Sequence, residues 1–350
     1  MTRRLLVILA LLVAAGVGWE PAPTPAAAQT TTGYRVVMVG DISPPTNETK
    51  GDDHATAELI AKLDPDLVCL LGDVQYETGS SAMFNAPVGF EGSYGRLFRS
   101  KIRCVVQGNH DSADPGPGAP SLTAYFADAL DLPCKADPAP CDPAAGYWVL
   151  DLDVDRNGQP DWYILGINSN CQRASGGTGD IQTPSCANDS PMVNWMRSAT
   201  AARHGGATSG RKCSIVADHH ERWGSGFFAD DPALNYPWQV GNHYHYDVWE
   251  SGHTHSVARM GALTWDGHLS PTGSGQRQIT SGAGGRSLTP FRVSPPREGT
   301  RYRANTLYGV NLLTLTSSTS AAGWLTGTWR SQFFYADGSV ADDAQAGCWP

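Results

Sequence analysis

The sequence has no excess of basic residues. Its 350 residues include 25 Lys and Arg against 34 Asp and Glu, which gives a formal net charge of −9. Proteins that grip nucleic acid by its phosphates usually carry a basic excess, so this balance argues against a nucleic-acid partner. Charged residues make up 17% of the chain and hydrophobic residues 41%, which is typical of a globular protein and not of a disordered one.

Long apolar runs are missing beyond the amino terminus, where none approaches the ~20 residues that a membrane-spanning helix needs. The amino terminus itself has the three regions of a secretory signal peptide: Arg3 and Arg4, an apolar stretch from Leu5 to Val17, and small residues up to Ala28. We therefore expect residues 1–28 to be removed on export. Residues 29–350 would then be a secreted, periplasmic or cell-surface domain with no membrane association. The alternative, an uncleaved anchor, needs a longer apolar stretch.

Cysteine pairs of the C-x-x-C type, which mark zinc and redox sites, are absent, although the chain has eight cysteines. An even number of cysteines suits an oxidising compartment. Two pairs flank short loops, so we expect local disulfides between Cys134 and Cys141 and between Cys171 and Cys186. The remaining four are able either to pair or to stay as buried thiols: Cys69, Cys104, Cys213 and Cys348.

Short apolar runs rich in β-branched residues recur along the chain, and each leads into a small or polar residue and then a potential metal ligand. These predicted strands are Val36–Val39, Leu67–Leu71, Ile102–Val106, Ile215–Ala217 and Val248–Trp249. Sites in open α/β sheets lie beyond the carboxyl ends of the strands. Strands that all deliver ligands at the same end therefore predict one shared site.

The rest of the pattern predicts one α/β domain, because no internal repeat or interdomain linker is visible. Helical spacing of apolar residues predicts helices at Asp53–Leu63 and Pro191–Ala202. The carboxyl-terminal segment is predicted to form antiparallel strands, with a turn at Asp337-Gly338. The predicted strands are Leu312–Leu315, Trp324–Trp329 and Gln332–Tyr335.

The residues that follow the five runs have a common chemistry. They are Asp41, Asp73, Asn109, His219, His253 and His255. Carboxylate, amide carbonyl and imidazole suit iron, manganese and zinc. Six such ligands are too many for one catalytic ion with open positions, but they suit two ions that share one carboxylate. Two ions ~3.5–4 Å apart can clamp the attacking and leaving oxygens of a phosphoryl displacement.

The motifs that carry these ligands occur in a defined order. They are Gly40-Asp41, Gly72-Asp73-Val74-Gln75-Tyr76, Gly108-Asn109-His110-Asp111, Val216-Ala217-Asp218-His219 and Gly252-His253-Thr254-His255. This series, which covers residues 36–255, resembles the calcineurin-like metallophosphoesterases and, within them, the purple acid phosphatases. The resemblance implies an α/β fold in which two mixed β-sheets form a sandwich flanked by helices.

The resemblance also implies how two ions are held. Asp41, Tyr76 and His255 would hold the first ion, Asp73 would bridge, and the second ion would be held by Asn109, His219 and His253. The general family pattern has a His two residues after the first Asp. Here that position is Ser43, and Tyr76 would supply the missing ligand.

Charge counting assigns different metals to the two positions. The first has anionic Asp41 and Tyr76 with a share of Asp73, whereas the second has only its share of Asp73 beside neutral ligands. Tyrosine has a pKa of ~10, so it needs a strongly acidic metal to stay deprotonated near neutrality. We therefore expect ferric iron at the first position and divalent iron, zinc or manganese at the second, as the resemblance also implies.

The implied function is an exported phosphatase that hydrolyses small phosphate monoesters by attack of a metal-bound hydroxide. His110 is our candidate for stabilising the transition state or protonating the leaving alcohol, and Asp111 for fixing its orientation. His220 is a candidate phosphate contact, together with Arg222. Many family members have a Pro two residues after the fourth-motif His. Here that residue is Glu221, so the resemblance does not predict the shape and charge of the substrate rim.

Two other functions remain as alternatives. A phosphodiesterase or nucleotide hydrolase would use the same metals, because the motifs set the reaction centre and not the leaving group. A non-catalytic metal- or phosphate-binding surface protein is the alternative from another class, and intact His110 argues against it. The sequence leaves the natural substrate and the oligomeric state open.

A separate segment resembles a calcium loop. Its oxygen ligands would be Asp153, Asp155, Asn157 and Asp161, with a Gly at the turn. The Glu expected at the twelfth position is Ile164. The alternative is a plain hairpin, because Asn157-Gly158 between apolar runs is a strong turn signal.

Overall fold

The computed structural model describes residues 33–45, 52–77, 81–111, 146–171, 185–204, 211–319 and 325–348. The predicted signal peptide and the predicted Cys134–Cys141 disulfide lie outside these residues. Within them, no helix is long and apolar enough to cross a membrane.

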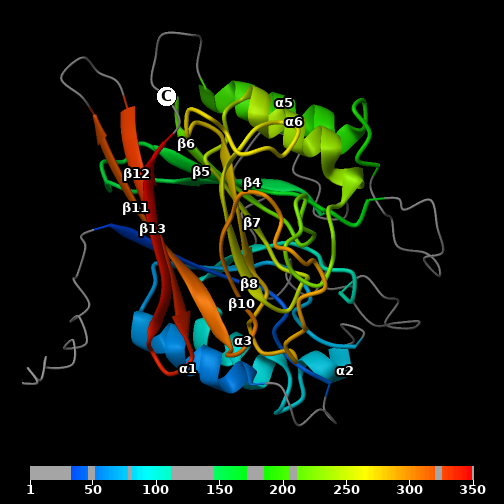
Figure 1. The fold of residues 1–350 in the computed structure, drawn as a ribbon. Helices are drawn as coiled ribbons and strands as arrows, with labels where there is room; N and C mark the ends of the chain where they lie inside the picture. The colour runs from blue at the N-terminus through cyan, green and yellow to red at the C-terminus, as the bar shows by residue number, and fades with distance from the viewer. Residues whose placement is uncertain are drawn as a thin grey trace, which may run out of the picture. The chain divides into compact units, whose positions relative to one another are not determined.

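The first sheet combines amino-terminal parallel strands with a carboxyl-terminal meander. Strands β1 (Tyr34–Val39), β2 (Leu67–Leu70) and β3 (Ile102–Val105) run parallel, and β11 (Gly309–Thr319) pairs antiparallel with β1. Strands β12 (Leu325–Tyr335) and β13 (Val340–Gly347) complete the order β13-β12-β11-β1-β2-β3 (Figure 1).

The tail differs from the prediction in two respects. The expected strands Trp324–Trp329 and Gln332–Tyr335 are parts of one strand, β12, because its pairing with β11 runs without a break from Leu325 to Tyr335. The turn at Asp337-Gly338 leads into β13, which the sequence analysis did not predict. Apart from Val340, this edge strand consists of Ala, Asp, Gln and Gly, so it carries little hydrophobic signal.

The second sheet is also mixed and has the order β10-β8-β9-β7-β6-β5-β4. Its parallel part consists of β5 (Trp162–Gly166), β6 (Cys213–Ala217), β7 (Val248–Ser251) and β9 (Gln276–Ser281). The antiparallel strands are β4 (Trp148–Leu152), β8 (Val257–Leu263) and β10 (Thr300–Ala304).

Both predicted helices are present. Helix α1 (Asp53–Leu63) begins after Asp52, whose side chain accepts from the Ala55 N–H at 3.2 Å. Helix α5 (Pro191–His204) runs two residues beyond the predicted end. The other helices of the described chain are α2 (Ser81–Phe84), α3 (Tyr94–Phe98) and α6 (Asn235–His243), with short 3₁₀ turns at Phe90–Gly92 and Pro232–Leu234.

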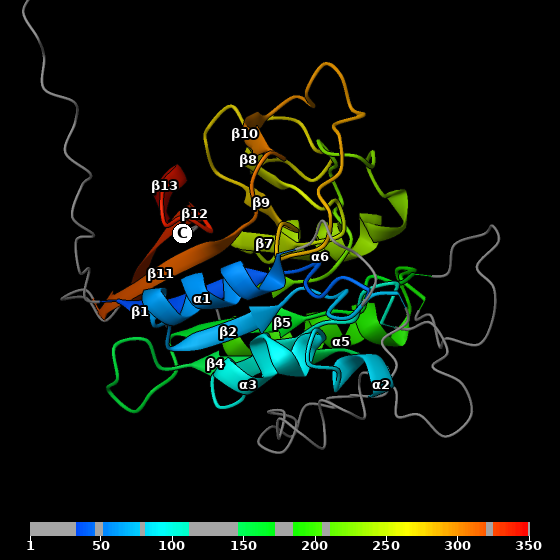
Figure 2. The ribbon, with the colours of Figure 1, turned by 90° about the horizontal axis from the view of Figure 1, so that it is seen from below.

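Hydrophobic residues fill three layers between these elements. The inner faces of the two sheets share one core, in which Met38 and Leu313 of the first sheet join Ile215 and Ile279 of the second. Helices α1 and α3 cover the outer face of the first sheet, and α5 and α6 cover that of the second (Figure 2). The predicted α/β sandwich of two mixed sheets flanked by helices is therefore confirmed.

Disulfides join all the described cysteines. The expected Cys171–Cys186 bond is present. Of the four cysteines left open, Cys69 pairs with Cys104 across the neighbouring strands β2 and β3, and Cys213 pairs with Cys348. The last bond ties the end of the chain to β6, 135 positions away in sequence.

The carboxyl ends of the parallel strands from both sheets meet on one side. The Gly40 N–H, just after β1, donates to the carbonyl of Ser281 at the end of β9 at 2.8 Å. The Gly252 N–H, just after β7, donates to the carbonyl of His219, just after β6, at 3.0 Å. Segments that follow β1, β2, β6 and β7 thus border a common region.

Candidate metal centre

The chain turns sharply where the strands deliver their polar residues. Four of the predicted ligands have left-handed backbone: Asp41 (φ 58), Asp73 (φ 49), His253 (φ 70) and His255 (φ 31). This conformation costs about 1–3 kcal/mol for a residue with a side chain, and such strain gathers at functional sites. The turns bring side chains that belong to different sheets towards one another.

The first group of donors gathers around the hydroxyl of Tyr76, which is buried. This oxygen lies 2.7 Å from Asp41 Oδ1, 2.8 Å from Asp73 Oδ2 and 2.9 Å from His255 Nε2. The structure therefore brings together all four residues predicted for the first metal position.

The second group gathers around His219, which is fully buried. His219 Nε2 lies 3.2 Å from Asn109 Oδ1 and 3.2 Å from His253 Nδ1. The same nitrogen is 3.4 Å from Asp73 Oδ2. The residues predicted for the second position are thus also adjacent, and Asp73 borders both groups.

Hydrogen bonds to the backbone hold Asp73 and Asp41 between the groups. Asp73 Oδ1 accepts from the His110 N–H at 2.8 Å, and Asp41 Oδ2 accepts from the His253 N–H at 2.7 Å. A Cβ atom at Gly108 would lie only 2.0 Å from Asp73 Oδ1, so the glycine of the third motif is required by this close approach.

The electrostatics of the two groups fit cations. Burial raises the pKa of Tyr76 well above its ordinary value, and the two carboxylates beside it add to the effect; burial also raises the pKa of Asp41. Burial opposes ionisation of Asp73 too, but the adjacent His219 outweighs this and lowers its pKa. Asp73 in turn raises the pKa of His219 to about 10, against the effect of burial. Buried oxygen and nitrogen donors that converge in this way suit iron, zinc or manganese ions.

His220 lies deeper than the sequence analysis expected. It is buried, its Nδ1 is 3.0 Å from Ser169 Oγ, and its ring centroid lies 4.3 Å from that of His253. Ligand atoms of His219, His220 and His253 all lie within 4.8 Å of one another. His220 is thus buried next to the second group of donors, and its contact with a phosphate stays a prediction.

His110 lies at the mouth of the centre, with 33% of its side chain exposed. Its Nδ1 donates to the Glu77 carbonyl at 2.9 Å, and its ring lies 4.6 Å from that of Tyr76. The expected orienting role of Asp111 is wrong. The Asp111 carboxylate is buried and accepts from the N–H groups of Val74 and Gly108, both at 2.9 Å, so it braces the motif loops. Burial raises its pKa to about 7.

Three rim residues were missed by the sequence analysis. Glu77 orients His110 and also forms a 2.8 Å ion pair with Arg286, whose guanidinium lies 4.9 Å from the Tyr76 ring centroid. The Phe228 ring stacks on the ring of His253. The position of Glu77 directly after the second motif was a usable signal, whereas Arg286 and Phe228 lie outside the five motifs.

The residue at the replaced ligand position, Ser43, and two residues that the sequence analysis placed near the substrate rim, Glu221 and Arg222, make other contacts. Ser43 donates to Asp53 at 2.9 Å and takes no part in the contacts around Tyr76. Glu221 is buried and accepts a hydrogen bond from the Thr254 hydroxyl, which helps to fix the position of the fifth motif. Arg222 is buried against the Trp223 ring and donates to Asn235 Oδ1 at 2.5 Å.

The segment that resembles a calcium loop joins β4 to β5. These strands pair antiparallel, which confirms the hairpin interpretation. The Asp153 carboxylate accepts from the N–H groups of Asn157 and Gly158, and buried Asp161 accepts from that of Val154. Calcium binding by Asp153, Asp155, Asn157 and Asp161 stays a prediction.

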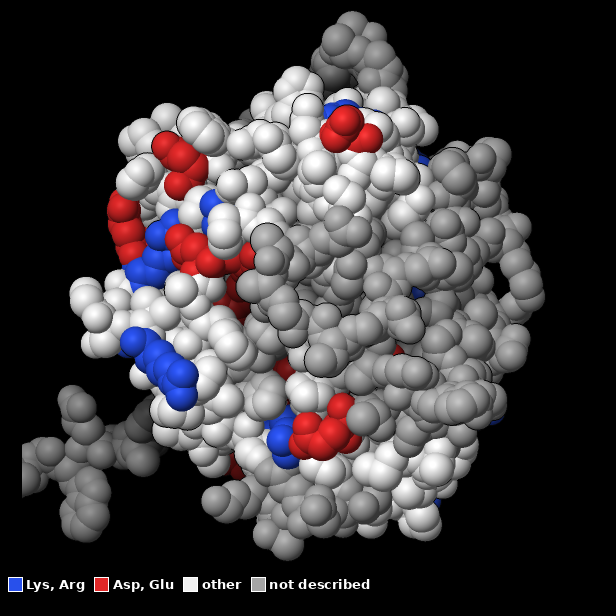
Figure 3. Space-filling model, turned by 90° about the vertical axis from the view of Figure 1, so that its right-hand side faces the viewer, with Lys and Arg blue, Asp and Glu red and all other residues white. Residues whose placement is uncertain are grey.

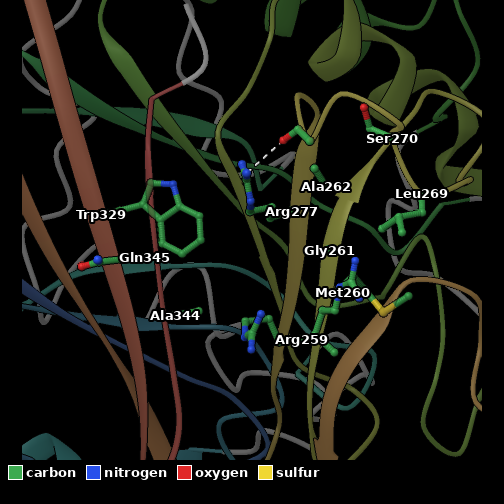
Figure 4. Close-up of a pocket in the computed structure, with 12 residues that line it drawn as sticks. Arg259, Met260, Gly261, Ala262, Leu269, Ser270, Arg277, Trp329, Ala344 and Gln345 are labelled. Atoms are coloured by element: carbon green, nitrogen blue, oxygen red, sulfur yellow. Dashed lines mark hydrogen bonds between the residues drawn. The ribbon is translucent and has the colours of Figure 1, made fainter.

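A cavity of about 470 Å³ lies apart from these donors, between β8 and β9 on one side and β12 and β13 on the other (Figure 4). None of the candidate metal ligands lines it. Its wall includes Arg259 and Arg277, but Arg259 is paired with Asp342 at 2.5 Å and Arg277 donates to the Gly273 carbonyl at 3.1 Å. On the face drawn in Figure 3, most described Lys and Arg side chains likewise lie beside Asp or Glu, and the described residues of that face form no broad basic patch.

Comparisons with known proteins agree with this geometry. The family model described as calcineurin-like phosphoesterase matches residues 34–257, which contain all the candidate metal ligands. No curated protein matches the chain.

Solved structures share the fold. GAP50, described as the anchor in the inner membrane complex of Plasmodium, has a TM-score of 0.58 and 13% identity over 90% of this chain and 89% of that chain. Purple acid phosphatase PPD1 from yellow lupin (Lupinus luteus) seeds has a TM-score of 0.58 and 16% identity over 89% of this chain. The match spans 53% of the lupin protein, about half its length.

Proposed function

Because the chain belongs to the calcineurin-like phosphoesterase family, we propose that it is a phosphatase that uses two metal ions to hydrolyse phosphate monoesters. The observation that carries the proposal is the position of Asp73. Its Oδ2 lies 2.8 Å from the Tyr76 hydroxyl and 3.4 Å from His219 Nε2, so one carboxylate is able to serve both groups of donors.

Asp41, Tyr76 and His255 would hold one ion, Asn109, His219 and His253 the other, and Asp73 both. When bound, the ions supply positive charge that polarises the phosphoryl group and activates water for attack. His219 and His255 are already set for ligation. Their Nδ1 atoms donate to the carbonyls of Leu71 and Ser287, at 2.8 Å and 2.9 Å, so Nε2 of each ring is the atom that would face an ion, which in His219 would take the place of the Nε2 proton.

His110 would handle the proton of the leaving group. Its Nδ1 is committed to the Glu77 carbonyl, which leaves Nε2 as the atom that exchanges a proton with the departing alcohol. Arg286, held by Glu77, adds positive charge at the same side of the rim for the phosphate to approach.

We further propose ferric iron beside Tyr76 and divalent iron, zinc or manganese at the second position. Burial opposes ionisation of the Tyr76 hydroxyl, and only a strongly acidic ion would keep it as tyrosinate. Tyrosinate on ferric iron gives a visible charge-transfer band, so the purified protein should be coloured. Tyr76→Phe should abolish the band; a band that survives this change would refute the assignment.

Export of the protein is part of the proposal. Disulfides at all the described cysteines fit an oxidising compartment, and residues 1–28 have the pattern of a signal peptide. Mass spectrometry of the mature protein from the culture medium or cell envelope should find an amino terminus near residue 29. An intact Met1 on cytoplasmic protein would contradict this.

One experiment separates the phosphatase from its alternatives. Elemental analysis should find about two ions per chain, and the protein should hydrolyse an aryl phosphate monoester faster than the matching diester. Faster turnover of the diester would favour a phosphodiesterase. Two tightly bound ions without turnover of either ester would favour a non-catalytic binding protein.

A further inference from the structure

Phe228 is one of the few large hydrophobic side chains that the described chain exposes, with 42% of its surface open to solvent. Its ring stacks on the imidazole of His253, with the centroids 4.3 Å apart and the planes 15° from parallel. His253 covers one face of the Phe228 ring, so this partly exposed aromatic side chain lies next to a candidate metal ligand.

The segment that carries Phe228 is fixed by its neighbours. The Phe227 ring packs edge-on against Phe228 at 4.9 Å, and the Arg292 guanidinium lies 3.8 Å from the Phe227 centroid. Arg292 and Val293 both donate backbone N–H groups to the Gly226 carbonyl, at 3.1 Å and 3.2 Å. The exposed ring is thus held in place before any ligand arrives.

The two sides of the rim differ in chemistry. His110, Glu77 and Arg286 form a polar side next to Tyr76, where a phosphate and a departing alcohol oxygen find charged partners. Phe228 forms an apolar side next to His253. A phosphate ester bound at the metal centre with an organic group on this side would bring that group next to the Phe228 ring.

We propose that Phe228 is a stacking platform for a planar aromatic leaving group, so that the preferred substrates are phosphate monoesters of phenols or nucleosides. This inference rests on the proposed phosphatase function. Water replaces the ester oxygen on phosphorus, and the aromatic alcohol leaves with a proton. Offset stacking between aromatic rings contributes about 0.5–1.5 kcal/mol beyond area burial, which corresponds to roughly 3- to 10-fold in binding.

The test compares three phosphate esters across variants of Phe228. The esters are phenyl phosphate, a nucleoside 5′-monophosphate and glycerol phosphate. We expect Phe228→Ala and Phe228→Leu to lower the ratio of aromatic to glycerol kcat/KM about 3- to 10-fold, mainly through KM, and Phe228→Trp to preserve it. The ester whose ratio falls further identifies the source of the aromatic group. Tyr236→Ala, at an equally exposed (42%) aromatic on α6, is the matched control and should change nothing.

A binding measurement keeps the inference separate from the proposed function. Phenylphosphonate should bind the metal-loaded wild type more tightly than methylphosphonate, and the preference should shrink 3- to 10-fold in Phe228→Leu. Metal content, measured in every variant, controls for a disturbed His253. Equal changes for both phosphonates, or none, would overturn the platform. A wild type that hydrolyses none of the esters yet keeps the phenylphosphonate preference would refute the phosphatase and leave the platform standing.

Discussion

The metal centre and the cavity between β8–β9 and β12–β13 both contain charged side chains, but Arg259 and Arg277 of the cavity wall each have an opposite or polar partner. Arg259 makes two bonds to Asp342, at 2.5 Å and 2.9 Å, and Arg277 is held by backbone carbonyls. At the centre, by contrast, the carboxylates of Asp41 and Asp73 and the hydroxyl of Tyr76 converge on one another.

This difference shows what identifies a reactive site in the fold. The cavity is large enough for a small ligand, yet two of the arginines in its wall, Arg259 and Arg277, are already hydrogen-bonded within the protein. The centre gathers buried acceptors whose pKa values are shifted by burial and by one another. Convergent donors in strained backbone mark the site better than empty volume does.

The largest expected effect comes from removing the shared charge of the centre. Asp73→Asn keeps the shape of the side chain but not its negative charge, so the chain should lose bound metal and kcat/KM should fall at least about 1,000-fold. Elemental analysis and phosphatase assays measure both. Arg277→Gln, in the wall of the cavity, is the control and should keep metal content and activity. An Asp73→Asn variant with both ions and full activity would refute the two-group centre.

A smaller loss is expected at His110, which lies on the rim and not among the ligands. His110→Asn should lower kcat about 100- to 1,000-fold while the metal content stays that of the wild type. Glu77→Gln, which keeps the backbone carbonyl that orients the ring, should cost much less. Loss of metal in His110→Asn would show that the imidazole supports the ligands instead of the leaving group.

The sequence predicted the parts of the fold that depend on local pattern. Apolar runs with a ligand after each one located β1, β2, β3, β6 and β7, and the cap and spacing located α1 within its observed bounds. Six of the seven candidate ligands followed from the same runs, because strands fix where their carboxyl ends emerge, whereas Tyr76 followed from the resemblance to the purple acid phosphatases. The polar edge strand β13 was not predicted, because its stability depends on pairing with β12 and not on the hydrophobic pattern of its own residues.

Contacts between segments that are distant in the chain could not be predicted from the sequence pattern. The pairing Cys213–Cys348 depends on where the tail meets β6, and eight cysteines allow 105 pairings. Asp111 was assigned to His110 by proximity in sequence, whereas the fold turns it inward to the motif loops. Phe228 lies in a loop whose position is set by bonds to residues 292–293.

Glu250 offers an intermediate case, buried like the centre but hydrogen-bonded like the cavity. It accepts from Ser281 Oγ at 2.9 Å and from Asn311 Nδ2 at 2.6 Å, and its burial raises its pKa to about 8. Because the folded state holds this proton more tightly than the unfolded state, stability should fall as pH rises from about 5 to 8, by up to roughly 1.4 kcal/mol per unit.

Glu250→Gln should remove that part of the pH dependence. The amide mimics the protonated acid: its oxygen can accept from Asn311 while its NH₂ donates to the Ser281 hydroxyl. Urea unfolding of wild type and variant between pH 5 and 8 gives the difference, in which the other buried carboxylates cancel. Parallel curves for the two proteins would show that Glu250 is ionised in the fold.

The smallest effect is expected in the cavity itself, where adjacent residues of β13 provide a matched pair. Asp342 pairs with Arg259, which lines the cavity, and these two side chains are 13% and 17% exposed, whereas those of the pair Asp343 and Arg330 are 41% and 30% exposed. Asp342→Asn should lower stability by about 1–2 kcal/mol because it leaves Arg259 half-buried without its counter-charge, and Asp343→Asn by less than about 0.5 kcal/mol because solvent screens an exposed pair. Neither should change metal content or turnover. Loss of turnover in Asp342→Asn would mean that the cavity takes part in the reaction. The pairing of charged side chains would then not distinguish the cavity from the metal centre.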